Sequence, residues 1–408
     1  MAQSIERKIL VKRREGLALA LSGGGFRATL FHLGLLRRLN EINLLQKVNA
    51  ISSVSGGSIT NALLAKTEPH WKTKKLSDTE WNTIIRDPLV AVCTHNIRTK
   101  PILKSLFTLG KQRQAVDYIE KHYQELLTDQ TLGDLPISVD FIFCASDIVF
   151  STMWYYRRMT SANRRTGNHR AGWLRDWENI PVAQAVAASS CFPPVFSPQY
   201  LQKSPSDFIK PANPTANWED LVSQVRLTDG GVYDNLGLEP VWDAYKYLIC
   251  SDGGKPSIYK SSEGVGTLLR FNSLIQTQVA NLRRRMLIER DTNPTLDFKC
   301  CYLGIHKGDT PGGYSAAFAS EMISNIRTDL DSFSETEARV LENHNYFLAD
   351  HYLKKYLIKD DFGLPFDKDA LEAPAVPFPD EMNESKLRTD MKDSPKRTLL
   401  FSLRPSFL

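Results

Sequence analysis

The chain has 408 residues, a formal net charge of +5, and 42% hydrophobic and 24% charged residues. This balance excludes a disordered chain, and the mild basic excess gives little support to nucleic-acid binding. The length allows one large α/β domain with insertions, or two smaller domains.

Cysteine spacing and the apolar runs narrow the class of protein further. The six cysteines form no C-x-x-C pair, and no Cys/His set has zinc spacing. We therefore expect buried free thiols in a reducing compartment, with no metal and no cofactor. The charged N-terminus lacks the apolar segment of a signal peptide, and no apolar run is long enough to span a bilayer. We expect a cytoplasmic protein whose membrane contact, if any, is peripheral.

Two strand–helix units open the chain. Residues 16–21 form a continuous apolar run, typical of a strand buried on both faces, and residues 28–44 carry leucines at helical spacing. The runs 48–54 and 57–66 repeat this order. Such a succession predicts a three-layer α/β/α fold with a mainly parallel central sheet.

Longer connections interrupt the pattern after residue 66. Residues 67–113 are polar and contain several prolines, which indicates a helical insertion that is a candidate lid or surface arm. Further elements are expected at 114–128 (helix), 137–148 and 153–158 (strands), 180–190 (helix), 227–232 (a strand that ends in a turn) and 247–251 (strand). The basic triplet Arg283-Arg284-Arg285 and a cluster at residues 7–14 either meet anionic lipid or form a solvated face.

The last third of the chain is expected to be mostly helical. Residues 268–288 form one predicted helix, and another starts near Ser334, which forms a capping-box pattern with Glu337. From residue 359 the chain becomes proline-rich and acidic, which predicts an extended, weakly packed tail. We therefore expect a catalytic domain over residues 1–358, with core motifs at 16–260, and a tail over 359–408.

Ser55 is the candidate nucleophile. It follows a buried strand and precedes a helix in the turn Ser53-Val54-Ser55-Gly56-Gly57, which matches G-x-S-x-G with serine in place of the first glycine. Small neighbours allow a strained corner that projects the hydroxyl, and the helix N-terminus favours negative charge. The alternative is a serine that merely caps the helix.

Three consecutive glycines end the first strand. Gly23, Gly24 and Gly25 let backbone N–H groups converge on one point, as an oxyanion hole or a phosphate cradle requires. The phosphate role is less favoured because the lysine and the glycine spacing of nucleotide-binding loops are missing. Arg27 would add positive charge to this nest or brace the loop through backbone carbonyls.

The candidate base is an aspartate. Asp229 lies at a strand end before Gly230 and Gly231, and an aspartate alone can act as general base if it meets the serine directly. An ordinary Asp-Gly turn is the alternative for this residue. No histidine has an obvious catalytic context, and His32, inside the first helix, is expected to be a packed core residue.

Together, these three motifs resemble the patatin-like phospholipase family. The pattern G-G-G-x-R/K-G appears at residues 23–28, with Ala28 in place of the last glycine, the serine motif spans 53–57, and D-G-G is intact at Asp229. Secondary resemblances are Cys144 to Asp147, Ala185 to Pro194 and Val232 to Asn235. The resemblance covers about residues 16–260.

This resemblance implies a lipid acyl hydrolase that cleaves fatty-acyl esters with a Ser55–Asp229 dyad. The backbone N–H groups of Gly24 and Gly25, with help from Arg27, would hold the oxyanion, and an acyl-lipid would be the substrate. Two other hypotheses remain open. One is a Ser-His-Asp hydrolase, which needs His306 or His344 near Ser55; the other is a catalytically silent lipid- or nucleotide-binding member of the fold.

Overall fold

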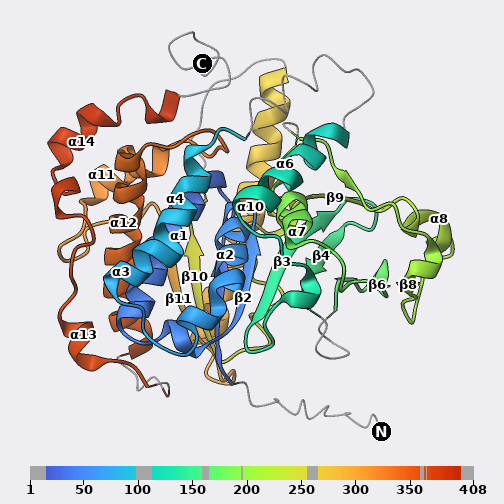
Figure 1. Ribbon diagram of the computed structural model, residues 1–408, viewed down its shortest axis with the longest axis horizontal. Helices are drawn as coiled ribbons and strands as arrows, with labels where there is room; N and C mark the ends of the chain where they lie inside the picture. Colours follow the sequence, from blue (N-terminus) through green and yellow to red (C-terminus); the bar gives the residue numbers. More distant parts are fainter. Residues whose placement is uncertain are drawn as a thin grey trace, which may run out of the picture.

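The centre of the molecule is a mixed β-sheet with helices on both faces (Figure 1). The computed structural model describes residues 15–97, 113–158, 165–193, 196–254, 265–358, 363 and 365–396. Eleven strands of these ranges join one sheet, in the order β11-β10-β1-β2-β3-β4-β5-β6-β8, while β9 pairs with β3 and β7. This architecture confirms the predicted fold class.

The strands are β1 (Leu17–Leu21), β2 (Val48–Val54), β3 (Asp140–Asp147), β4 (Thr152–Tyr156), β5 (Gly167–Asn168), β6 (Gly172–Leu174), β7 (Gln199–Tyr200), β8 (Phe208–Ile209), β9 (Arg226–Asp229), β10 (Tyr247–Asp252) and β11 (Lys299–Gly304). The α-helices are α1 (Gly25–Glu41), α2 (Gly56–Trp71), α3 (Asp78–Trp81), α4 (Asp87–Thr94), α6 (Arg113–Leu126), α7 (Val182–Ser190), α8 (Trp218–Val222), α9 (Gly231–Asp234), α10 (Val265–Thr292), α11 (Ala316–Glu321), α12 (Glu335–Leu353), α13 (Lys368–Glu372) and α14 (Glu384–Asp390).

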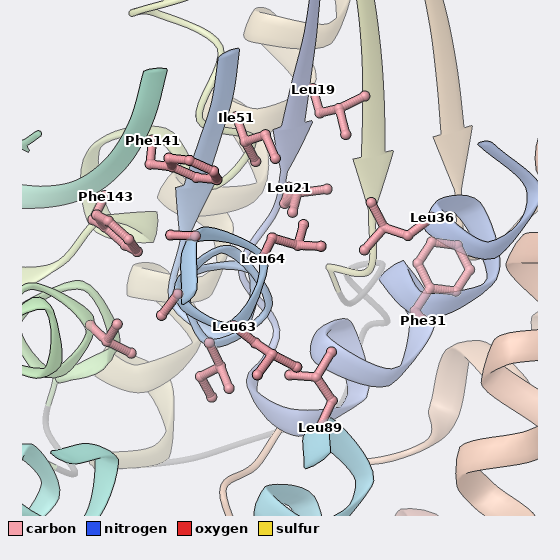
Figure 2. Close-up of a cluster of buried hydrophobic side chains, with 14 of the residues drawn as sticks. Leu19, Leu21, Phe31, Leu36, Ile51, Leu63, Leu64, Leu89, Phe141 and Phe143 are labelled. Carbon is pink, nitrogen blue, oxygen red and sulfur yellow. The ribbon is translucent and has the colours of Figure 1, made fainter. Parts of the chain in front are cut away.

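The five strands β11, β10, β1, β2 and β3 are parallel, and β4 and β9 are antiparallel to β3. Their side chains alternate between two apolar layers. In β1, Leu19 and Leu21 face the layer that holds α1 and α2 (Figure 2), whereas Ala18 and Ala20 face the other layer. The uninterrupted apolar run of β1 therefore reflects burial on both faces, as the sequence predicts.

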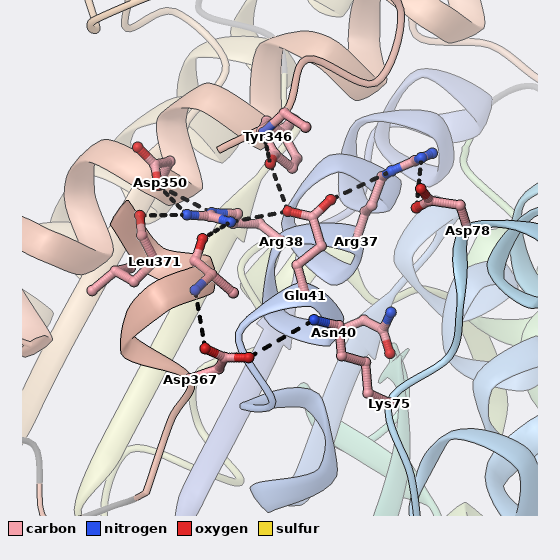
Figure 3. Close-up of polar contacts among 12 residues, drawn as sticks. Arg37, Arg38, Asn40, Glu41, Lys75, Asp78, Tyr346, Asp350, Asp367 and Leu371 are labelled. Carbon is pink, nitrogen blue, oxygen red and sulfur yellow. Dashed lines mark hydrogen bonds and ion pairs between the residues drawn. The ribbon is translucent and has the colours of Figure 1, made fainter. Parts of the chain in front are cut away.

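The C-terminal helices are locked onto α1 by a buried polar network (Figure 3). Gly34 lets α12 approach closely, because a methyl group there would lie 2.5 Å from the Tyr346 nitrogen. Arg38 donates to Asp350 at 2.6 Å, to Glu41 at 2.9 Å and to the Leu371 carbonyl at 2.8 Å. Buried charges persist only with such partners, so α12 and α13 complete the fold of the N-terminal half.

Two regions are more tightly packed than their composition suggests. Trp81 and Leu89, in the described part of the predicted insertion, belong to the main apolar core, so that part is not a surface arm.

The proline-rich segment after residue 359 includes α13 and α14, whose Leu371 and Leu387 are buried. These few apolar side chains dock the segment, which corrects the expectation of an extended tail. The boundary at residue 358 stays a prediction, and residues 399–403 lie outside the described ranges.

Other expectations hold in detail. Ser334 and Glu337 form the predicted capping box at the start of α12. All six cysteines are buried and unpaired, as expected. Among the helices that the structure describes, none is both long enough and apolar enough to cross a membrane.

Candidate active site

The three motifs meet at the carboxyl ends of the central strands, the edge where open α/β sheets bind ligands. The glycine loop follows β1, and Ser55 follows β2, which pairs with β1. The third group, Asp229, is the last residue of β9.

Register explains how Asp229 reaches Ser55. Strand β2 pairs with the first part of β3 and ends at Val54, opposite Cys144. Strand β9 runs antiparallel to the second part of β3 and ends with Asp229 opposite Ala145. The ends of β2 and β9 therefore meet head to head on neighbouring positions of β3, which brings together residues that are far apart in the sequence.

Ser55 occupies a strained backbone conformation. Its φ of 51° and ψ of −120° are unfavourable for a residue with a side chain, and such strain concentrates at functional sites. The glycines that follow are required for space, since a methyl group on Gly56 or Gly57 would collide with the carbonyl oxygens of Gly25 or Leu21. The structure thus has the sharp strand-to-helix corner that the sequence predicts.

A network of buried hydroxyl groups supports this corner on the side that faces the protein interior. Ser189, on α7, accepts a hydrogen bond from the Ser55 N–H at 2.9 Å and donates to the Cys144 carbonyl at 2.7 Å. Ser58 links it to Ser53, with oxygen–oxygen distances of 2.8 Å and 3.0 Å. Ser53 stands at the position of the first glycine in G-x-S-x-G. Its side chain is fully buried and is part of this network. Sequence reasoning gave Ser189 no role of its own, although the residue lies in the segment from Ala185 to Pro194 that resembles the family.

The glycine loop packs directly against the serine corner. Gly24 and Gly25 have positive φ values of 144° and 59°. The Gly23 N–H donates to the Asn235 carbonyl at 3.0 Å and is thereby occupied. Within the described ranges, the N–H groups of Gly24 and Gly25 have no hydrogen-bond partner, so they are the free donors of this loop.

Arg27 braces the loop from behind. Its guanidinium is fully buried and donates to the carbonyls of Gly253 at 2.7 Å, Ile326 at 2.7 Å and Ser324 at 3.1 Å. Burial lowers the pKa of Arg27 to about 9, although the charge of the nearby Asp252 opposes this effect. Of the two roles considered for this arginine, the carbonyl contacts favour bracing.

The carboxyl group of Asp229 is buried beside Ser55. Its Oδ1 accepts a hydrogen bond from the Gly231 N–H at 2.7 Å. Burial raises the pKa of Asp229 to about 7, while the Gly231 N–H and the Ser55 hydroxyl favour the charged form. Gly230 is needed beneath it, since a methyl group there would collide with the Cys144 carbonyl.

The histidines of the rival triad lie away from Ser55. His344 is buried and bonds the Ile305 carbonyl at 2.8 Å, and His306 follows β11. Strand β11 lies three strands from β2, or roughly 14 Å at the usual strand spacing. His32 bonds Ser251 and the Ser22 carbonyl inside the core, where burial lowers its pKa to about 4.

The basic triplet on α10 is mostly used internally. Arg283 pairs with Glu239 at 2.8 Å and stacks on Tyr233 and Trp242, and Arg284 donates to the Tyr302 hydroxyl at 3.3 Å. Arg285 is exposed. This arrangement corrects the view of the triplet as one solvated or lipid-facing patch, and residues 7–14 lie outside the described ranges.

Comparison with solved structures finds distant resemblances. Human GIVD cytosolic phospholipase A2 matches with a TM-score of 0.49 and 12% identity, over 88% of this chain and 63% of that chain. VipD from Legionella pneumophila matches with a TM-score of 0.35 and 12% identity, over 84% and 67%. The chain thus corresponds to less than two thirds of the human structure. No curated protein sequence matches it.

A family model gives the decisive match. The model of the patatin-like phospholipases matches residues 19–242, more than half of the chain, and includes the glycine loop, the serine corner and Asp229. The chain belongs to the patatin-like phospholipase family.

Proposed function

We propose that this protein is a lipid acyl hydrolase in which Ser55 and Asp229 form the catalytic dyad. Asp229 takes the Ser55 proton as Oγ attacks the ester carbonyl carbon, which gives a tetrahedral oxyanion. When this intermediate collapses, the proton passes to the departing alcohol and an acyl-enzyme remains. Water then attacks, Asp229 takes its proton, and collapse releases the fatty acid and returns a proton to Ser55.

The oxyanion is assigned to the N–H groups of Gly24 and Gly25. Support comes from their lack of other partners among the described residues, and from their position against the serine corner. The Gly23 N–H is bound to Asn235 and the Arg27 guanidinium to carbonyls, so both support the loop without facing the oxyanion. Preformed donors of this kind stabilise charge that develops in the transition state.

One observation carries the proposal: a buried carboxylate with a raised pKa faces a serine held in a strained corner. A helix-capping serine would need neither feature. The Ser-His-Asp alternative loses its support because His306 and His344 lie near β11 and are several strands away. The catalytically silent alternative rested on Ser53, whose hydroxyl is accommodated in the network below the corner.

The direct test of the activity uses a mixed extract of phospholipids and galactolipids. Incubation with the wild-type protein is expected to release free fatty acids and the matching lyso-lipids, measured by mass spectrometry. The head groups that disappear identify the substrate class. An extract that remains unchanged, while a patatin of known activity hydrolyses it, would contradict the assignment.

Peripheral contact with a lipid surface is part of this proposal, and α10 offers the side chains for it. The helix follows β10 and leads to β11, so its N-terminal half lies at the sheet end that carries Ser55. It projects beyond the sheet in Figure 1. Phe271, Ile275 and Leu282 are 57%, 63% and 55% exposed, and their spacing of four and seven places them on one stripe.

Replacing this stripe should separate lipid binding from chemistry. We expect Phe271→Ser combined with Ile275→Ser to reduce co-sedimentation with phospholipid vesicles about tenfold, because two apolar side chains leave the interface. Hydrolysis of a water-soluble p-nitrophenyl ester should be unchanged. The matched control is Ile137→Ser, which removes a 76% exposed apolar residue that lies before β3, at the opposite end of the sheet. Equal vesicle binding by all three proteins would refute the role of α10.

A further inference from the structure

Asn235 lies beside the proposed dyad but has no role in the chemistry described so far. A methyl group on Gly231 would lie 2.6 Å from its Oδ1 and 3.0 Å from Asp229 Oδ1. A methyl group on Gly23 would touch the same Oδ1 and would lie 3.1 Å from Ser55 Cβ. The amide oxygen of Asn235 therefore borders both the nucleophile and the base.

Among the described residues, the side-chain amide of Asn235 has no hydrogen-bond partner. Its main-chain carbonyl accepts the Gly23 N–H, which fixes the position of the residue. Its side chain is only partly buried. A side-chain amide has two donor hydrogens and an acceptor oxygen, so a partly exposed amide on a fixed backbone can hydrogen-bond with a ligand.

The other end of the amide points to a polar region at the end of β10. A methyl group on Gly254 would lie 2.9 Å from Asn235 Nδ2 and 2.8 Å from Asp252 Oδ1. Asp252 also accepts the Tyr302 hydroxyl at 2.5 Å, and Arg284 lies on the far side of that hydroxyl at 3.3 Å. A fatty-acyl chain would desolvate these groups without pairing them, whereas the alcohol part of a lipid ester could hydrogen-bond with them.

We propose that Asn235 is a substrate-contacting residue whose Nδ2 donates to a polar oxygen in the alcohol part of the bound ester. This places the alcohol part of the lipid over the ends of β10 and β11, and the carbonyl oxygen at Gly24 and Gly25. The inference rests on the proposed function. It adds the orientation of the substrate in the site.

The test compares two esters that differ in the alcohol part. Asn235→Ala should lower kcat/KM about tenfold for a short-chain phospholipid such as dihexanoyl glycerophosphocholine, because an oxygen of its alcohol part loses a hydrogen bond. Hydrolysis of a p-nitrophenyl ester should fall by a clearly smaller factor, since the nitrophenyl group lacks the oxygens of glycerophosphocholine. The main-chain bond to Gly23 does not depend on the side chain, so the melting temperature should hold. An equal loss for both esters, or no loss for either, would overturn the proposal.

A second variant separates substrate contact from a structural role. Asn235→Asp keeps the shape but places a carboxylate beside Asp229, which should shift the acid limb of kcat/KM to higher pH for both esters. An unshifted limb would overturn the placement of Asn235 at the dyad. Labelling of Ser55 by a fluorophosphonate reports on the proposed function itself. Wild-type protein that neither labels nor hydrolyses any ester refutes the dyad. Normal labelling of Asn235→Ala, together with a selective loss on the phospholipid, supports the substrate contact.

Discussion

Ser55→Ala is expected to abolish ester hydrolysis, with a loss of kcat on the order of 10⁴-fold or more, because no other group can form the acyl-enzyme. The fold should be preserved. The Ser55 N–H bond to Ser189 comes from the main chain and remains in the variant. The measurement is initial-rate hydrolysis of a p-nitrophenyl ester, together with the melting temperature.

Ser151→Ala is the matched control for this variant. Ser151 is also a serine with positive φ, at 53°, in an exposed turn between β3 and β4. The same substitution in the same backbone region should leave hydrolysis at the wild-type rate. Near-wild-type turnover by Ser55→Ala would show that the nucleophile has been placed on the wrong residue.

Asp229→Asn is expected to reduce hydrolysis nearly as severely, since an amide cannot take the Ser55 proton at neutral pH. In the wild type, the pKa of about 7 predicts that kcat/KM rises with pH through this value, because only the ionised carboxylate is a base. This rise of kcat/KM with pH should be absent from the residual activity of Asp229→Asn. A pH profile that is flat across the neutral range in the wild type would argue against Asp229 as the base.

The same substitution should make the protein more stable at alkaline pH. In the unfolded chain the carboxyl ionises near its ordinary pKa of about 4, whereas in the folded chain it keeps its proton up to about pH 7. Between these values, rising pH favours the unfolded state, so an ionised Asp229 destabilises the fold at about pH 8. The side-chain amide of the variant carries no such charge. Asp229→Asn should therefore melt at a higher temperature than the wild type at about pH 8, but not at about pH 4.

Two control variants accompany the activity and melting measurements on Asp229→Asn. Asp147→Asn replaces another buried aspartate with a raised pKa, one that caps the turn at Val149 and Phe150. This substitution should change the melting temperature without shifting the pH at which kcat/KM rises. His306→Gln tests the rival triad and should retain hydrolysis. Loss of activity in His306→Gln, with a normal melting temperature, would favour a histidine base.

Most of the fold follows from local patterns that the sequence displays openly. A continuous apolar run such as residues 16–21 has few structures open to it other than a strand buried on both faces, and three glycines followed by spaced leucines mark the turn and the helix. The parallel core and the Ser55 corner are therefore predictable. These features depend on neighbours in the chain, for which spacing is informative.

Features that depend on distant partners were not predictable. The approach of Asp229 to Ser55 depends on β9 pairing antiparallel to the end of β3, a register that no local pattern encodes, so only the family resemblance implied this pair. Arg37 and Arg38 lie off the leucine stripe of α1, where charged residues usually meet solvent, yet both are buried against α12. Ser53 departs from the elbow pattern, and the partners that accommodate it, Ser58 and Ser189, become visible only once α7 packs beneath the corner.

The most direct test of the account is the site of covalent labelling by a fluorophosphonate, mapped by peptide mass spectrometry. We expect one modified residue, Ser55, in the wild-type protein, with no label in Ser55→Ala and normal label in Ser151→Ala. Labelling should be slow in Asp229→Asn and should rise through about pH 7 in the wild type. A label on another serine, or equal labelling of Ser55→Ala, would contradict the central claim.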